Sequence, residues 1–168
     1  MMNVTGGSEE VSNKMVVRAP TFMKWGWVRS LFQRTPRVDA TALQDYRAVV
    51  SPLLDRAECL YQQWIETVET ISDSERVANI ASTQSWEMAS LSERLGACTP
   101  PEGLVPLHER CLKAFAFGRK AGRLLSTGYR YHNSDSLCDG IASLEDARQL
   151  HLSAMAELAA LSSPERSA

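Results

Sequence analysis

His108 and Cys111 lie three residues apart and combine an imidazole with a thiol, two groups that bind metal ions and take part in nucleophilic catalysis. On a helix this spacing places both side chains on one face. His151 falls on the inner face of a later predicted helix, so the three side chains could line a pocket in the core together with Trp64 and Tyr129. A core pocket that binds a small ligand or supports a minor enzymatic activity is therefore one hypothesis for function.

No complete catalytic or metal-binding motif accompanies these residues. A metal pair in a helical bundle is typically held by two Glu-x-x-His motifs with two further carboxylates, and the sequence contains no Glu-x-x-His. The serines gather at predicted turns and outer helix faces rather than beside a histidine base. Residues 118–122 superficially resemble a phosphate-binding loop, but they lie inside a predicted helix, where the backbone N–H groups are already bonded. We expect no catalytic residue, no metal ion and no cofactor.

A second candidate is a row of basic side chains on the outer face of the same predicted helix. Arg119, Arg123 and Arg130 fall within a narrow arc, and Lys113 and Lys120 flank them. Such a row could bind the phosphate groups of lipid or nucleic acid. The commoner alternative is that the row pairs with acidic residues of neighbouring helices. The acidic residues considered for this pairing are Glu66, Glu69 and Asp146.

A third candidate is a short basic and aromatic segment, residues 22–34. Thr21 can cap a helix there and Pro36 follows its end, so the segment is predicted to be an amphipathic helix. Its predicted interaction surface consists of Lys24, Trp25, Trp27, Val28, Arg29, Leu31, Phe32 and Arg34. Aromatic residues beside basic ones are typical of helices that lie on a membrane surface or contact a protein partner. Docking of this helix onto the rest of the chain is the alternative.

Four longer helical segments must position these candidates. In residues 43–71 apolar side chains recur every three or four residues, as in one stripe of a single helix. The predicted stripe consists of Leu43, Tyr46, Val50, Leu53, Ala57, Leu60, Trp64, Val68 and Ile71. Pro52 lies within it, so either Ser51 caps a new helix or one helix continues with a kink. Because the apolar spacing continues across Pro52, we predict the continuous, kinked helix.

Three further segments show the same periodicity: residues 75–96, 104–131 and about 134–161. The predicted inner face of the last segment consists of Leu137, Ile141, Leu144, Ala147, His151, Ala154, Leu158 and Leu161. Short turns favour antiparallel neighbours, so residues 41–162 are predicted to form an all-α, up-down-up-down antiparallel four-helix bundle. Thr41 and Gln44 are the expected capping box of the first helix. Residues 1–40 are predicted to be a flexible arm with the short amphipathic helix, and residues 163–168 a tail.

Charge is unevenly distributed along the 168-residue chain, although its net charge is only −2. Residues 11–38 contain six basic residues and no acidic one, whereas residues 39–168 contain 12 basic and 18 acidic residues. The arm is therefore basic and the body acidic, which argues against a dedicated nucleic-acid-binding protein. The four cysteines are widely spaced and are expected to be buried and reduced. These cysteines are Cys59, Cys98, Cys111 and Cys138.

The sequence has no apolar run of signal-peptide or membrane-span length, so we expect a cytoplasmic protein that could associate peripherally with a membrane. Met15 and Met23 are alternative translation starts to Met1. Our leading hypothesis is a non-enzymatic helical scaffold or adaptor. It would engage a protein partner or an anionic membrane surface through the segment 22–34, and its aromatic stripes could also form a homodimer.

Overall fold

The computed structural model describes residues 39–161, and all of their regular structure is helical. The elements are α1 (Ala40–Thr70), α2 (Ser74–Gly96), the short 3₁₀ turn η2 (Glu102–Leu104), α3 (Val105–Tyr131) and α4 (Ser134–Ala160). The predicted all-α class is confirmed, because four helices pack together and no strand occurs between residues 39 and 161. The predicted helix at residues 22–34, with its interaction surface, lies outside the described residues.

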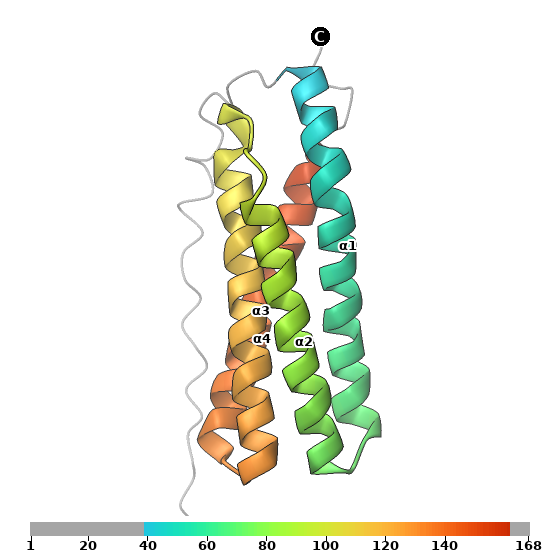
Figure 1. Cartoon of the computed structure of the whole chain (residues 1–168), viewed down its shortest axis with the longest axis vertical. Coiled ribbons are helices and arrows are strands. Elements are labelled where there is room, and N and C mark those ends of the chain that lie inside the picture. Colours follow the sequence, from blue (N-terminus) through green and yellow to red (C-terminus); the bar gives the residue numbers. More distant parts are fainter. Residues whose placement is uncertain (1–38, 162–168) are drawn as a thin grey trace, which may run out of the picture. The chain divides into compact units, whose positions relative to one another are not determined.

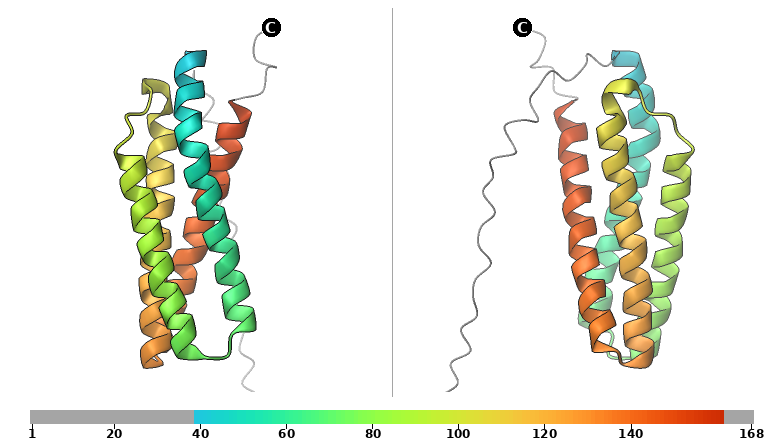
Figure 2. Two further views of the ribbon diagram at one scale, coloured as in Figure 1. Left: turned by 45° about the vertical axis from the view of Figure 1, so that its right-hand side comes forward. Right: turned by 90° about the vertical axis from the view of Figure 1, so that its left-hand side faces the viewer.

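The four helices run side by side along one axis (Figure 1). In Figure 1 the connections from α1 to α2 and from α3 to α4 lie at the lower end, and the connection from α2 to α3 lies at the upper end. The two further views in Figure 2 show the same order. Helix α3 comes close to α2 and α4 along much of its length, whereas α1 approaches its neighbours at fewer positions.

Glycines explain the close approach of α2, α3 and α4. A Cβ atom added to Gly122 of α3 would lie 2.8 Å from the carbonyl oxygen of Ala81 in α2. A Cβ atom added to Gly140 of α4 would lie 2.7 Å from Leu125 Cγ in α3. Both distances are too short for any side chain, so these helices meet backbone against backbone or against the base of a neighbouring side chain.

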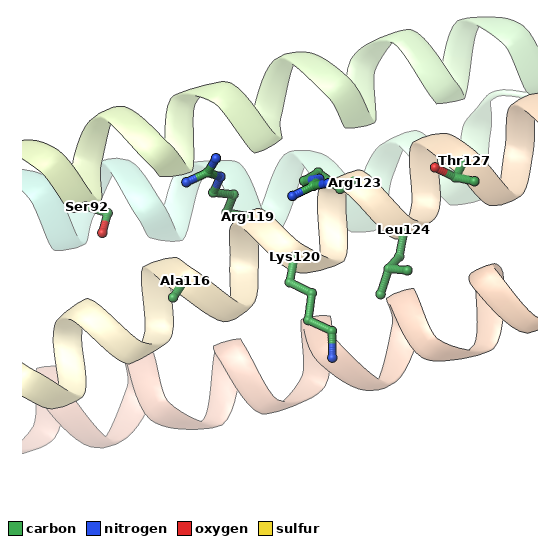
Figure 3. A pocket seen from close by; sticks show the side chains of 7 residues that line it. All are labelled: Ser92, Ala116, Arg119, Lys120, Arg123, Leu124 and Thr127. Atoms are coloured by element: carbon green, nitrogen blue, oxygen red, sulfur yellow. The ribbon is translucent and has the colours of Figure 1, made fainter.

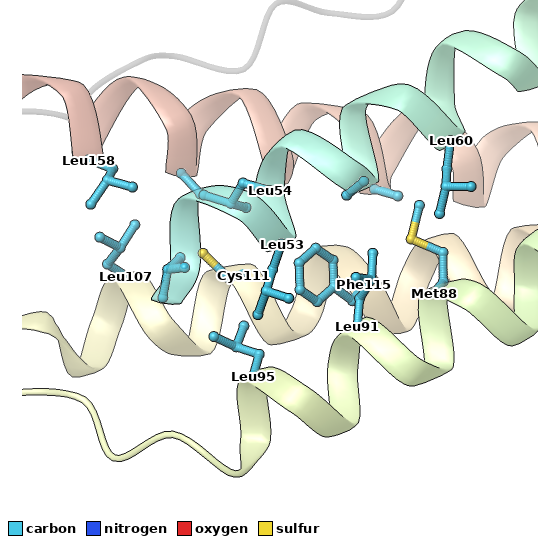
Figure 4. Close-up of a cluster of buried hydrophobic side chains, with 14 of the residues drawn as sticks. Leu53, Leu54, Leu60, Met88, Leu91, Leu95, Leu107, Cys111, Phe115 and Leu158 are labelled. Atoms are coloured by element: carbon cyan, nitrogen blue, oxygen red, sulfur yellow. The ribbon is translucent and has the colours of Figure 1, made fainter. Parts of the chain in front are cut away.

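Helix α1 meets the other three helices mainly through large side chains. Figure 4 shows this part of the core, in which side chains of α1 interdigitate with those of the other three helices. The labelled residues are Leu53, Leu54, Leu60, Met88, Leu91, Leu95, Leu107, Cys111, Phe115 and Leu158. Tyr61 spans the gap to α3, where its hydroxyl would lie 3.2 Å from a Cβ added to Gly118. The Met88 sulfur of α2 would lie at the same distance from that Cβ, so Gly118 makes room for side chains of both α1 and α2.

Helix α1 continues through Pro52 without a break, as predicted, and Ser51 does not cap a new helix. Val50 and Leu53 are buried on either side of Pro52 and hold both halves of α1 against the same core. The start of α1 corrects the prediction for Thr41. Asp39 is the N-cap, and its carboxylate accepts a hydrogen bond from the backbone N–H of Ala42 at 3.2 Å.

Two predicted inner positions are wrong: Val68 is 48% exposed and Ile141 is 58% exposed. The buried stripe of α1 alternates steps of four and three residues, and this heptad pattern reaches Thr67 instead of Val68. In α4 the inner position belongs to Gly140, the neighbour of Ile141, because only a glycine fits against Leu125.

The prediction of four buried cysteines holds only for Cys111. Cys98 is partly buried, while Cys59 and Cys138 are exposed because they lie next to inner positions rather than on them. All four cysteines are free thiols. No helix between residues 39 and 161 is long and apolar enough to cross a membrane.

Candidate functional site

The outer face of α3 carries a row of basic side chains, as the sequence predicts. We call it the cationic stripe and define it as Lys113, Arg119, Lys120, Arg123 and Arg130, all of them exposed. At 1.5 Å per residue, the stripe extends about 26 Å along the helix. Glu109, which is also exposed, lies one turn before Lys113 and is the nearest carboxylate on this face of α3.

The cationic stripe has little acidic compensation. No ion pair between described residues includes Arg119, Lys120 or Arg123. Pairing of these three side chains with acidic neighbours is therefore not observed within residues 39–161. The acidic residues predicted for that pairing were Glu66, Glu69 and Asp146. Arg130 differs from the other members, because its guanidinium donates a hydrogen bond to the Asn79 side-chain oxygen at 3.0 Å.

Two hollows lie over the stripe where α3 meets α2. The first has a volume of about 580 Å³ and is lined by Ser92, Ala116, Arg119, Lys120, Arg123, Leu124 and Thr127. In Figure 3, Arg119 extends toward α2 and Lys120 extends toward α4. The second hollow has a volume of about 330 Å³ and is lined by Ser82, Ser85, Trp86, Arg119, Arg123, Ser126 and Thr127. We call it the Trp86 hollow. Neither lining contains a carboxylate.

Close helix packing places the two arginines beside α2. Gly122 lies between Arg119 and Arg123 in the sequence, and its missing side chain lets this turn of α3 rest on Ala81. One turn further along α2, the Ser85 hydroxyl donates a hydrogen bond to the backbone carbonyl oxygen of Arg119 at 3.0 Å. These two contacts fix the backbone of Arg119 and Arg123 relative to α2, although the side chains themselves are flexible.

Trp86 is a member of the site that sequence reasoning missed. It is 74% exposed, although large aromatic side chains are usually well buried in folded proteins. The sequence does contain a signal for this exposure. Trp86 lies two residues from Gln84 and two from Met88, which are both inner residues of α2, so helix geometry places it on the outer face. Its proximity to Arg119 and Arg123 depends on how α2 and α3 are aligned, which the sequence pattern does not reveal.

His108 and Cys111 are buried in α3, but His108 has a partner of its own in α1. A hydrogen bond joins its Nδ1 atom to the Tyr46 hydroxyl at 3.2 Å. Burial lowers the pKa of His108 and raises that of the Cys111 thiol to about 11. A thiol with such a pKa is protonated at neutral pH, so Cys111 lacks the thiolate character of a catalytic nucleophile.

His151 is fully buried in α4 and contacts a different part of α1. Its Nε2 atom lies 3.2 Å from Glu58 Oε2, although neither atom makes a well-aligned hydrogen bond to a described residue. Its ring packs edge-on against Tyr61, with ring centroids 5.3 Å apart. Burial lowers the pKa of His151, and the nearby carboxylates of Glu58 and Asp55 oppose that shift. The imidazole is therefore held mainly in its neutral form.

The predicted pocket of His108, Cys111 and His151 is therefore not formed, because the two histidines contact different tyrosines. His108 pairs with Tyr46 and His151 packs on Tyr61, and no group of three metal-binding side chains occurs within residues 39–161. Neither histidine lines the two hollows over the stripe or the third hollow beside them. The two histidines and Cys111 contribute to the core rather than to any of these hollows.

No protein-family model matches the sequence, and neither a curated protein nor a solved structure shows significant similarity to it. The arrangement with the clearest chemical capability is the cationic stripe with its hollows, since exposed guanidinium and ammonium groups without acidic partners bind anions.

Proposed function

We propose that this protein is a non-enzymatic scaffold, an up-down-up-down four-helix bundle, that binds anionic membrane surfaces. The observation that carries the proposal is the absence of acidic partners for Arg119, Lys120 and Arg123 among the described residues. The antiparallel order is supported by the short connections, residues 71–73 between α1 and α2 and residues 132–133 between α3 and α4.

The stripe carries a small energetic cost in the isolated protein. Arg119 and Arg123 are four residues apart on one helix, and like charges at this spacing destabilise a helix by about 0.2–0.5 kcal/mol. An anionic surface would turn that repulsion into attraction, because each Lys or Arg close to such a surface contributes about 1 kcal/mol of binding free energy. The lack of acidic partners for Arg119, Lys120 and Arg123 within residues 39–161 is therefore better explained by an external anion than by fold stability.

The basic segment before the bundle is proposed as a second membrane contact. Residues 11–38 contain six basic residues and no acid, and the predicted helix at residues 22–34 contains Trp25 and Trp27. Aromatic and basic residues together favour the membrane interface. Two weak contacts on one chain bind more firmly than either alone. We propose a peripheral attachment at the cytoplasmic face of a membrane on this basis.

The alternative of a ligand-binding core is less well supported. It required His108, Cys111 and His151 to line one pocket, whereas the two histidines have separate partners on α1. A protein partner with an acidic surface would use the same charges as a membrane would, and it becomes the favoured reading if membrane binding is not observed.

Flotation of the full chain with lipid vesicles tests the proposal. Vesicles that contain phosphatidylglycerol should carry the protein to the top of a density gradient at low ionic strength, and pure phosphatidylcholine vesicles should not. Binding should weaken steeply as salt is raised, because exposed charges are screened. Equal recovery with charged and neutral vesicles, or no recovery with either, would contradict the proposal.

A further inference from the structure

The Trp86 hollow combines three kinds of group that the rest of the stripe does not bring together. Arg119 and Arg123 supply two guanidinium groups, α2 supplies the exposed indole of Trp86, and both helices supply hydroxyl groups. The volume of about 330 Å³ is large enough for a compact polar group, since ligand pockets begin at about 300 Å³. These features define a site more specific than a row of charges.

Charge and geometry favour a phosphate monoester over a diester. The Cβ atoms of residues four apart on a helix are separated by about 6 Å, so the long side chains of Arg119 and Arg123 can converge on one anion. Each guanidinium can donate two parallel hydrogen bonds to oxygen atoms. A phosphate monoester offers three free oxygens and a charge of about −1.5 to −2 at neutral pH. A diester offers only two free oxygens and one charge.

Hydroxyl groups add uncommitted donors to the hollow. Ser82 on α2 and Thr127 on α3 line it, and neither side chain makes a hydrogen bond to another described residue. Ser85 is different, because its hydroxyl already donates to the carbonyl oxygen of Arg119. Ser82 and Thr127 can therefore donate to a bound phosphate oxygen without breaking a contact of the fold.

Trp86 indicates that the phosphate belongs to a lipid rather than to a small soluble molecule. Its ring is 74% exposed, and tryptophan is enriched where apolar lipid meets water, because it has an apolar body and one polar N–H group. The stripe also continues past the hollow to Lys113 and Arg130, and its length of about 26 Å exceeds that of one small ligand. An extended anionic surface matches both features.

We infer that the Trp86 hollow binds the phosphate monoester headgroup of a membrane lipid, of the kind that phosphatidic acid presents, with Trp86 in the membrane interface. This inference rests on the proposed function, because it requires the cationic stripe to face a membrane. The cationic stripe would attract any anionic surface, whereas the Trp86 hollow would recognise one kind of headgroup.

Vesicle binding by the full chain tests the inference. Phosphatidic acid and phosphatidylglycerol vesicles are prepared with equal measured surface potential, and the partition coefficient is determined for each at one ionic strength. The unmodified chain should bind the phosphatidic acid vesicles about tenfold more tightly, the ratio expected for one additional charge-assisted hydrogen-bonded contact. The variant Arg119→Lys/Arg123→Lys keeps both charges but loses the paired donors of each guanidinium. Its partition coefficients for the two vesicle types should therefore become equal, which means that the preference for phosphatidic acid is lost.

The control variant Arg76→Gln/Arg94→Gln removes two exposed charges of α2 that line none of the three hollows, and it should keep the preference. Equal binding of both vesicle types by the unmodified chain would overturn the headgroup site and leave the proposed function standing. Binding to neither would overturn the proposed function itself. Competition by glycerol 3-phosphate at micromolar concentration would overturn the assignment to lipid, since a soluble phosphate ester would then suffice. Circular dichroism establishes that each variant is folded.

Discussion

Ser85 in α2 donates a hydrogen bond to the backbone carbonyl oxygen of Arg119 in α3, with 3.0 Å between the two oxygen atoms. This contact joins two helices at the turn that presents the arginines of the hollow. The site therefore depends on the same packing that stabilises the fold. Changes to that packing should alter stability, whereas changes to the charged side chains should alter anion binding.

The Gly122→Ala substitution should destabilise the fold. The added Cβ would lie 2.8 Å from the Ala81 carbonyl oxygen and 2.9 Å from Ser85 Cβ, so α2 and α3 would have to move apart. Such overpacking typically costs about 1–3 kcal/mol, which exceeds the gain of about 1 kcal/mol from the better helix propensity of alanine. Urea unfolding followed by circular dichroism measures the difference.

Gly96→Ala is the matched control, because a Cβ there would have no atom within 4 Å. Gly96 is the last residue of α2, and alanine at that position should leave the free energy of unfolding unchanged or raise it by up to about 1 kcal/mol. Equal stability of the two alanine variants would show that α2 and α3 do not meet at Gly122.

Removal of the two arginines should not destabilise the protein. Arg119→Gln/Arg123→Gln eliminates a like-charge pair on adjacent turns and breaks no ion pair between described residues. The free energy of unfolding should rise by a few tenths of a kcal/mol at low ionic strength, and the gain should vanish at high salt. A loss of more than about 1 kcal/mol would reveal a structural partner and weaken the case for an external ligand.

Stability should decrease in mild acid because of the buried histidines. Burial lowers the pKa of His151 and His108, so below the ordinary histidine pKa of about 6.5 the unfolded chain binds more protons than the folded one. Above that pH, each neutral histidine makes its full contribution to the free energy of unfolding. As the pH falls below it, the free energy of unfolding decreases by at most about 1.4 kcal/mol per pH unit for each histidine.

Urea unfolding between pH 8 and pH 5 isolates this effect when the unmodified chain is compared with His151→Gln. The variant lacks one of the two buried histidines, so its free energy of unfolding should fall less steeply below about pH 6.5. The carboxylates of Glu58 and Asp55 favour protonation of His151. They should reduce the difference between the pH profiles of the two proteins without reversing its sign. Identical pH profiles for the two proteins would contradict burial of a neutral His151.

Much of the fold could be predicted because apolar periodicity reflects helix geometry directly. The spacing of Tyr46, Val50 and Leu53 across Pro52 predicted a continuous α1, and the range predicted for the fourth helix, about 134–161, agrees with α4. Errors arose where neighbouring helices decide the outcome. In α4, Gly140 occupies the inner position that was predicted for Ile141. The reason is its contact with Leu125, which belongs to another helix.

The candidate site could be predicted only in part, for the same reason. Arg119 and Arg123 share a face of one helix, so their spacing was sufficient to place them together. Trp86 lies more than 30 residues away, and only the alignment of α2 with α3 brings it to the same hollow. Sequence reasoning placed His108 and His151 inward correctly, but it could not reveal that they contact different tyrosines.

Vesicle binding by two charge-matched variants tests most directly whether the cationic stripe is a membrane-binding surface. Arg119→Gln/Arg123→Gln and Arg76→Gln/Arg94→Gln each remove two positive charges from exposed helix positions, but only the first pair lies on the stripe. With phosphatidylglycerol vesicles, the first variant should lose about 30-fold in partition coefficient, from about 1 kcal/mol per residue, and the second less than about threefold. Equal losses for both variants would show that only net charge matters and would contradict the assignment of the stripe.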